Sequence, residues 1–145
     1  MNDPRAYPDR PFLAVSAAII RDGRFLIVRR AMPPAEGLYT LPGGVVESGE
    51  TLTQAICREV REETALDIAP VALAGYREAI VRDDAGRIKR HFVILPFACR
   101  WLGGETALNG ELAEARWIAL PELEGLRTTE GLAGIVQAAF AIAAD

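Results

Sequence analysis

Residues 41–66 read LPGGVVESGETLTQAICREVREETAL, and the second half of this segment predicts one amphipathic helix. No Gly or Pro interrupts residues 51–64. Leu52, Ile56 and Val60 recur at a spacing of four, which places their side chains on one face of a helix. We expect that face to pack against a hydrophobic core.

Three glutamates continue this apolar face instead of opposing it. Glu59, Glu62 and Glu63 together span an arc of roughly 100° around the helix. Glu59 and Glu63 lie four residues apart, where like charges repel, and near the C-terminal end, where the helix dipole disfavours anions. Arg58 and Arg61 can relieve a solvated acidic helix end. A hard divalent cation can also relieve it, since Mg²⁺ prefers carboxylate oxygens and keeps several waters for substrate phosphates.

The spacing around these glutamates resembles the signature of the Nudix hydrolases. The matching positions are Gly44, Glu50, Arg58, Glu59, Val60, Glu62, Glu63 and Leu66. At ordinary residue abundances such a match arises by chance on the order of once in a million chains. One position departs, because the family has Gly where this chain has Ala65. That position follows the helix, where a left-handed backbone favours Gly, so the departure concerns local geometry and removes no ligand.

The resemblance implies a fold and an activity. The implied fold is an α/β protein, an α/β/α sandwich with a mixed central sheet, the signature helix and a C-terminal helix. The implied activity is metal-dependent hydrolysis of the diphosphate linkage in a nucleoside diphosphate bound to another group, either an ADP-ribose-like compound or a nucleoside triphosphate. Mg²⁺ is the implied cofactor, with Mn²⁺ as the substitute. The alternative is a catalytically weak Nudix-like domain that binds nucleotides or regulates.

The resemblance also implies roles for individual residues. The implied metal ligands are Glu59, Glu62, Glu63 and Glu111, with a backbone carbonyl from Gly43 or Gly44. The implied catalytic group is Glu59, Glu62 and Glu111, with Arg58 orienting carboxylates. Glu50 is the structural partner of Arg58. The general base is either a signature glutamate or one from a later loop, where Glu111 is the first candidate and Glu114 its rival.

Two arginines, Arg29 and Arg30, end the second expected strand and are candidates for binding a substrate phosphate. The competing interpretation is an exposed strand end. The sequence pattern does not decide between them.

The rest of the chain predicts a mixed sheet with helices packed on it. An Asp22-Gly23 turn between two apolar runs is a strong hairpin signal. Pro70 is expected to end the region after the first helix. Residues 1–145 are interpreted as one domain with an extended arm over residues 1–11. Strands are expected at residues 12–20, 24–28, 71–81, 91–101 and 115–119, and a helix over residues 132–143.

Composition narrows the class of partner. The chain has 145 residues, 16 Lys and Arg against 20 Asp and Glu, and one His. The resulting charge of −4 argues against a protein that grips nucleic acid, and disfavours action on the 5′ end of RNA. No apolar run approaches the roughly 20 residues of a membrane span. We therefore expect a cytoplasmic protein whose partner is a small nucleotide; homodimers are common in the family it resembles.

Overall fold

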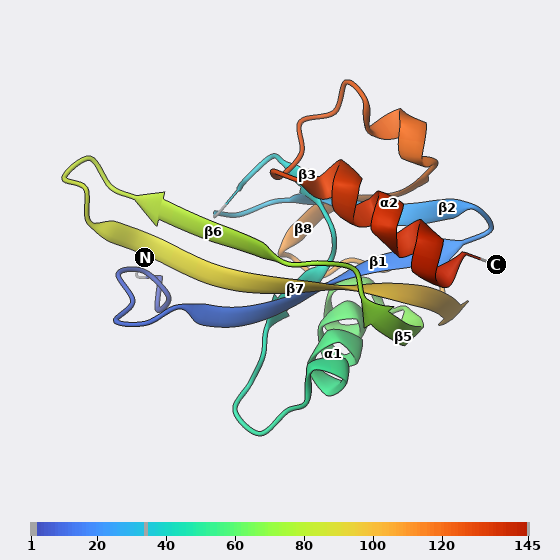
Figure 1. Ribbon diagram of the computed structural model, residues 1–145, viewed down its shortest axis with the longest axis horizontal. Helices are drawn as coiled ribbons and strands as arrows, with labels where there is room; N and C mark the ends of the chain where they lie inside the picture. Colours follow the sequence, from blue (N-terminus) through green and yellow to red (C-terminus); the bar gives the residue numbers. More distant parts are fainter. Residues whose placement is uncertain (1–2, 34, 145) are drawn as a thin grey trace.

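The computed structural model describes residues 3–33 and 35–144. Within that part of the chain, eight strands form one mixed sheet, accompanied by two α-helices and one 3₁₀ helix (Figure 1). The elements are β1 (Phe12–Arg21), β2 (Arg24–Arg30), β3 (Tyr39–Thr40), β4 (Gly43–Val45), α1 (Leu52–Thr64), β5 (Asp67–Leu73), β6 (Arg77–Arg82), β7 (Ile88–Gly103), β8 (Leu112–Ile118), η1 (Leu120–Leu123) and α2 (Leu132–Ala143). None of the described helices is long and apolar enough to cross a bilayer.

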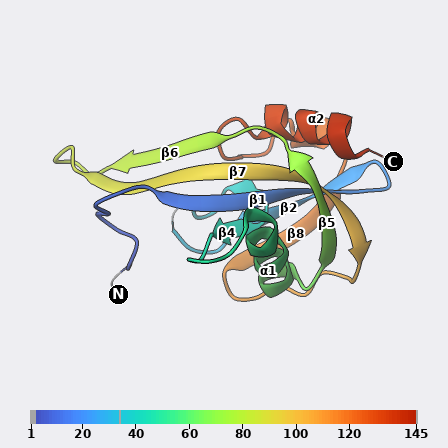
Figure 2. The ribbon, with the colours of Figure 1, turned by 60° about the horizontal axis from the view of Figure 1, so that its bottom comes forward.

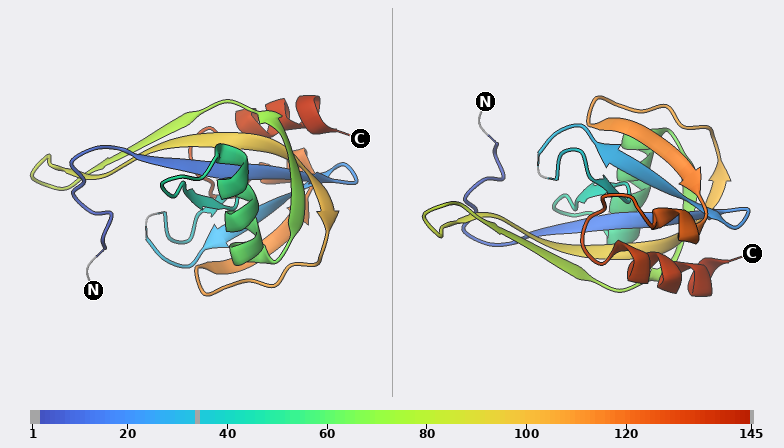
Figure 3. Two further views of the ribbon diagram at one scale, coloured as in Figure 1. Left: turned by 90° about the horizontal axis from the view of Figure 1, so that it is seen from below. Right: turned by 90° about the horizontal axis from the view of Figure 1, so that it is seen from above.

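The two α-helices cover opposite faces of the sheet. Figure 3 shows α1 in front of the sheet from below and α2 in front of it from above. Alternate residues of the central strands face each helix: Ala17 and Ile19 of β1 join the core under α1, whereas Ala18 and Ile20 join the core under α2. This arrangement confirms the expected α/β/α sandwich with a mixed central sheet.

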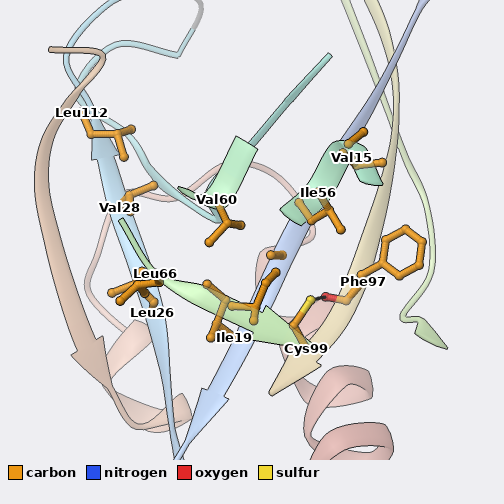
Figure 4. Packing of buried hydrophobic residues seen from close by; sticks show 13 residues of the cluster. Val15, Ile19, Leu26, Val28, Ile56, Val60, Leu66, Phe97, Cys99 and Leu112 are labelled. Carbon is orange, nitrogen blue, oxygen red and sulfur yellow. Dashed lines mark hydrogen bonds between the residues drawn. The ribbon is translucent and has the colours of Figure 1, made fainter. Parts of the chain in front are cut away.

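The core under α1 fixes the rotation of that helix. Ile56 and Val60 are fully buried against side chains of the sheet, among them Ile19 and Leu26 (Figure 4). Burying each of these aliphatic side chains contributes about 1.5–3 kcal/mol. Since Glu63 follows Val60 by three residues, the same rotation turns Glu63 toward the sheet.

Strand β1 pairs with different strands along its length, and the loop that carries Gly43 and Gly44 enters beside it. It pairs in parallel with β7 along its length, but it pairs with β2 only near the hairpin that joins them. Asp22 and Gly23 both have positive φ in that hairpin, as the sequence predicts for a tight two-residue turn. Further along, β4 takes the place of β2 beside β1. Figure 2 shows β4 and α1 on the same side of β1.

Two expectations from the sequence differ from the structure. Residues 3–11 form turns instead of the expected extended arm, and residues 1 and 2 lie outside the described residues. The Tyr7 N–H donates to the carbonyl of Lys89 (2.8 Å), which attaches this segment to the β6–β7 hairpin. The expected strand at residues 71–81 is broken at Gly75, whose φ is 136°. Pro70 does not end the preceding region. It lies inside the edge strand β5 at a register shift, where a missing N–H is tolerated.

Candidate active site

Helix α1 begins and ends with well-defined caps. The Thr51 side chain accepts from the Gln54 N–H (3.1 Å), and the Gln54 side chain accepts from the Thr51 N–H (2.9 Å). At the other end Ala65 adopts a left-handed conformation with φ 65°. The departure from Gly at this position therefore leaves the expected backbone geometry in place.

Glu59 and Glu63 lie against the loop that carries Gly43 and Gly44. Glu63 is 2% exposed, and its Oε1 accepts a hydrogen bond from the Gly43 N–H (2.9 Å). A Cβ at Gly44 would overlap the carboxylate of Glu59, and a Cβ at Gly43 would overlap the backbone of Val15. Both glycines are therefore required by close approach, and they seat the two carboxylates against the backbone of the loop.

Arg58 joins the helix to this loop. Its guanidinium binds both oxygens of Glu50 (2.7 and 2.8 Å), and it also donates to Glu59 (2.8 Å) and to the carbonyl of Val45 (3.1 Å). The ion pair expected between Glu50 and Arg58 is present. Its charge-assisted hydrogen bonds lower the pKa of Glu50 to about 2 and raise that of Arg58. Arg58 thus holds the carboxylate of Glu59 by a hydrogen bond, a contact compatible with the orienting role that the resemblance implies.

The structure separates Glu62 from the other two helix glutamates. Its side chain is 56% exposed and reaches Arg58 at 3.3 Å. No other hydrogen bond or ion pair of Glu62 occurs in the described part of the chain. The pair of carboxylates that faces the loop is Glu59 and Glu63.

Glu111, in the loop between β7 and β8, lies close enough to this pair to interact with it electrostatically. Burial is the main cause that raises the pKa of Glu63 to about 8, and the nearby charges of Glu59 and Glu111 contribute to this rise. Burial is also the main cause that raises the pKa of Glu59, and Glu111 again contributes. Three carboxylates from the helix and the β7–β8 loop are thus within electrostatic range of one another.

Glu114, the rival of Glu111, has other partners. It accepts a hydrogen bond from the Tyr39 hydroxyl (2.7 Å) and pairs with Arg29 (3.8 Å). A register shift between β2 and β8 places Arg29 opposite Glu114 and Arg30 opposite Leu112. Side chains alternate along β2, so Arg29 faces α2, while Arg30 faces α1 and lowers the pKa of Glu63. Of the two arginines, Arg30 is therefore the one on the carboxylate side.

The donor set fits a hard divalent cation. It consists of carboxylate oxygens and nearby backbone, which Mg²⁺ and Mn²⁺ accept. The raised pKa of Glu63 shows that its surroundings leave a negative charge there undercompensated. In the side-chain positions of residues 3–33 and 35–144, no three acidic, His or Cys side chains enclose a cation by themselves. Glu59 is instead turned to Arg58, and Glu63 to the N–H of Gly43.

Sequence reasoning missed two features of this region. The first is the hydrogen bond from the Gly43 N–H to Glu63, because the resemblance implied only a carbonyl oxygen of this loop as a metal ligand. The second is Asn109, to which the sequence pattern assigned no role. The side chain of Asn109 accepts from the Glu111 N–H (3.1 Å), and the Asn-x-Glu spacing is the signal that could have indicated this turn.

Comparisons with known proteins agree with this geometry. A family model described as the NUDIX domain matches residues 10–138. An ADP-ribose pyrophosphatase from Methanocaldococcus jannaschii is 34% identical over 116 residues, which is 80% of this chain and 66% of that protein. A MutT-like protein from Streptomyces ambofaciens is 32% identical over 85% of this chain and 75% of its own length. The crystal structure of a MutT NUDIX hydrolase from Burkholderia pseudomallei superposes with a TM-score of 0.77 at 26% identity, covering 90% of this chain and 98% of that one.

Proposed function

Because the chain belongs to the Nudix hydrolase family, we propose that it uses a divalent cation to hydrolyse the diphosphate linkage of a nucleoside diphosphate bound to a second group. The observation that carries this proposal is the pair Glu59 and Glu63, seated against Gly43 and Gly44 with Glu111 beside them. The presence of all three carboxylates argues against the alternative of a catalytically weak binding domain.

Glu59, Glu63 and Glu111 are the residues that would hold the cation, with a backbone oxygen of the Gly43–Gly44 loop. Mg²⁺ is the proposed ion and Mn²⁺ its substitute. When bound, such an ion neutralises phosphate oxygens and lowers the pKa of a water molecule. Glu62 is the more exposed candidate and would contribute from the rim of the site.

Side chains of the protein are proposed to perform the other steps of the reaction. Arg58 holds the carboxylate of Glu59 in position through a hydrogen bond. Glu111 is proposed to accept the proton of the attacking water, since a general base must lie within reach of that water and on the side of the metal ligands. Arg30 is proposed to bind a phosphate oxygen, because β2 directs it toward the same side.

ADP-ribose is the first proposed substrate, supported by the relative named as an ADP-ribose pyrophosphatase. In the reaction water adds its oxygen to one phosphorus, and the bridging oxygen leaves with the other phosphate. The products are AMP and ribose 5-phosphate. A nucleoside triphosphate is the second candidate, supported by the MutT-like relative and the MutT structure.

A substrate panel tests this proposal. Purified protein is incubated with ADP-ribose, NADH, dinucleoside polyphosphates and nucleoside triphosphates, each with Mg²⁺, Mn²⁺ or EDTA, and the products are separated by ion-exchange chromatography. We expect cleavage of at least one diphosphate linkage that requires the cation. Absence of turnover on every substrate with both ions would overturn the proposal and favour a binding domain.

A further inference from the structure

The segment that joins β7 to β8 is attached to the C-terminal end of α1. The last carbonyls of a helix have no partner inside the helix. Here the Ala107 N–H donates to the carbonyl of Thr64 (2.9 Å), and the Asn109 N–H donates to the carbonyl of Glu63 (3.3 Å). Gly104 also approaches the carbonyl of Ala65 so closely that a Cβ would lie 2.9 Å from it. These contacts fix the position of the loop relative to the C-terminal end of α1.

Asn109 connects this attachment directly to Glu111. Its backbone N–H binds Glu63, while its side-chain Oδ1 accepts from the Glu111 N–H (3.1 Å). Its carbonyl accepts from the Leu112 N–H (3.4 Å). The carbonyl of Glu111 in turn accepts from the Ala31 N–H (3.0 Å), which ties it to the end of β2. The backbone of Glu111 is thus held on both sides, and Asn109 supplies the side that leads to Glu63.

We propose that Asn109 is a positioning residue, which holds Glu111 beside Glu63 through its side-chain turn and so sets cation binding and turnover. The inference rests on the proposed function, because it gives Glu111 a role in the site. Asn suits the task for two reasons. Its short side chain reaches the N–H two residues on, and its amide adds no further negative charge next to three carboxylates.

Three substitutions separate the side-chain turn from other properties of Asn109. Asn109→Asp keeps an acceptor oxygen at the same reach, whereas Asn109→Gln keeps the amide but moves it one methylene further out. Asn109→Ala removes the acceptor. Thr106→Ala is the matched control, since Thr106 is exposed on the same loop and its side chain makes no hydrogen bond in the described part of the chain.

The first readout is turnover. Misplacing Glu111 is expected to lower kcat about tenfold in Asn109→Ala and Asn109→Gln with KM within twofold, while Thr106→Ala stays within threefold of wild type at saturating Mg²⁺. Asn109→Asp keeps the acceptor but adds a negative charge, so its loss of kcat is expected to be smaller than that of Asn109→Ala. In a Glu111→Gln background, Asn109→Ala is expected to change kcat less than twofold, because it acts only through Glu111. An unchanged kcat in Asn109→Ala, or an equal loss in the Glu111→Gln background, would overturn the inference.

The second readout does not need a substrate. Free Mn²⁺ is measured by electron paramagnetic resonance during titration of each folded variant. Loss of an orienting partner is expected to weaken Mn²⁺ binding about tenfold in Asn109→Ala and Asn109→Gln but not in Thr106→Ala. Equal Mn²⁺ affinity in all variants would overturn the inference. A wild type that binds Mn²⁺ but hydrolyses nothing would overturn the proposed function alone, and one that binds no Mn²⁺ would overturn both.

Discussion

Gly44 and Glu59 are in such close contact that no side chain can occupy position 44 without moving the carboxylate of Glu59. This contact joins the glycine loop to the helix at the point where Arg58 also holds Glu59. A substitution in the glycine loop is therefore expected to displace the carboxylate of Glu59, and a substitution of Glu59 is expected to alter the loop.

Gly44→Ala is expected to lower kcat at least tenfold, because its Cβ pushes Glu59 out of its position, and a misplacement of about 1 Å can cost about 10²-fold. Steady-state hydrolysis with Mg²⁺ measures the loss. Gly134→Ala in α2 is the matched control, since nothing lies within 4 Å of its Cβ position. It should keep full activity and raise stability by about 0.5–1 kcal/mol. Full activity in Gly44→Ala would show that the contact is not needed.

Glu111→Gln and Glu114→Gln should differ strongly although the residues are three apart. A lost general base is expected to lower kcat by about 10² or more. Glu114 is already bound to Tyr39 and Arg29 on the α2 side, so its substitution should leave kcat within threefold of wild type. Measuring the kcat of each variant at saturating Mg²⁺ shows which glutamate acts as the general base. A larger loss in Glu114→Gln would reverse the assignment.

Ala65→Gly is expected to stabilise the protein by about 0.5–1 kcal/mol. Ala65 has φ 65°, a left-handed conformation that costs an L-residue about 1–2 kcal/mol, part of which the greater freedom of Gly in the unfolded chain offsets. Urea unfolding measures the change. Ala133→Gly, at an exposed position inside α2, should destabilise by a similar amount. A destabilised Ala65→Gly variant would mean that the left-handed conformation carries no strain.

The ion pair of Glu50 with Arg58 predicts a pH dependence of stability. Hydrogen bonds from Arg58 lower the folded-state pKa of Glu50 to about 2, below its ordinary value of 4.5. Its contribution is therefore present in full above the unfolded-state pKa and is lost as pH falls toward 2. The difference in Tm between wild type and Glu50→Gln should be larger at pH 7 than at pH 3. A difference that is constant with pH would exclude this linkage.

Residue periodicity was enough to predict much of the fold and one part of the site. The four-residue spacing of Leu52, Ile56 and Val60 fixed which face of α1 is buried, and that face carries Glu63 into the core. The pair of positive-φ residues at the first hairpin follows directly from Asp-Gly. Features of this kind depend on side chains that are close together in the sequence, so the sequence alone can predict them.

Other features depend on contacts that side-chain patterns do not encode. The attachment of Asn109 to α1 uses a backbone N–H and a backbone carbonyl, which every residue except proline carries. The opposite directions of Arg29 and Arg30 follow from strand register, where a shift of one residue exchanges the faces. The break at Gly75 divides residues 71–81 between two strands. Both strands pair with the same long strand β7, so the run looks like one strand in the sequence.

The most direct test of the proposed site is the kcat of Glu63→Gln with Mg²⁺ on the best substrate of the panel. Glutamine has nearly the same shape, and its amide oxygen can still accept from the Gly43 N–H, so the variant should fold. We expect a loss of at least 10²-fold in kcat with an unchanged circular dichroism spectrum, because the buried carboxylate charge is gone. A folded Glu63→Gln variant with a kcat within threefold of wild type would contradict the assignment of this glutamate as a metal ligand.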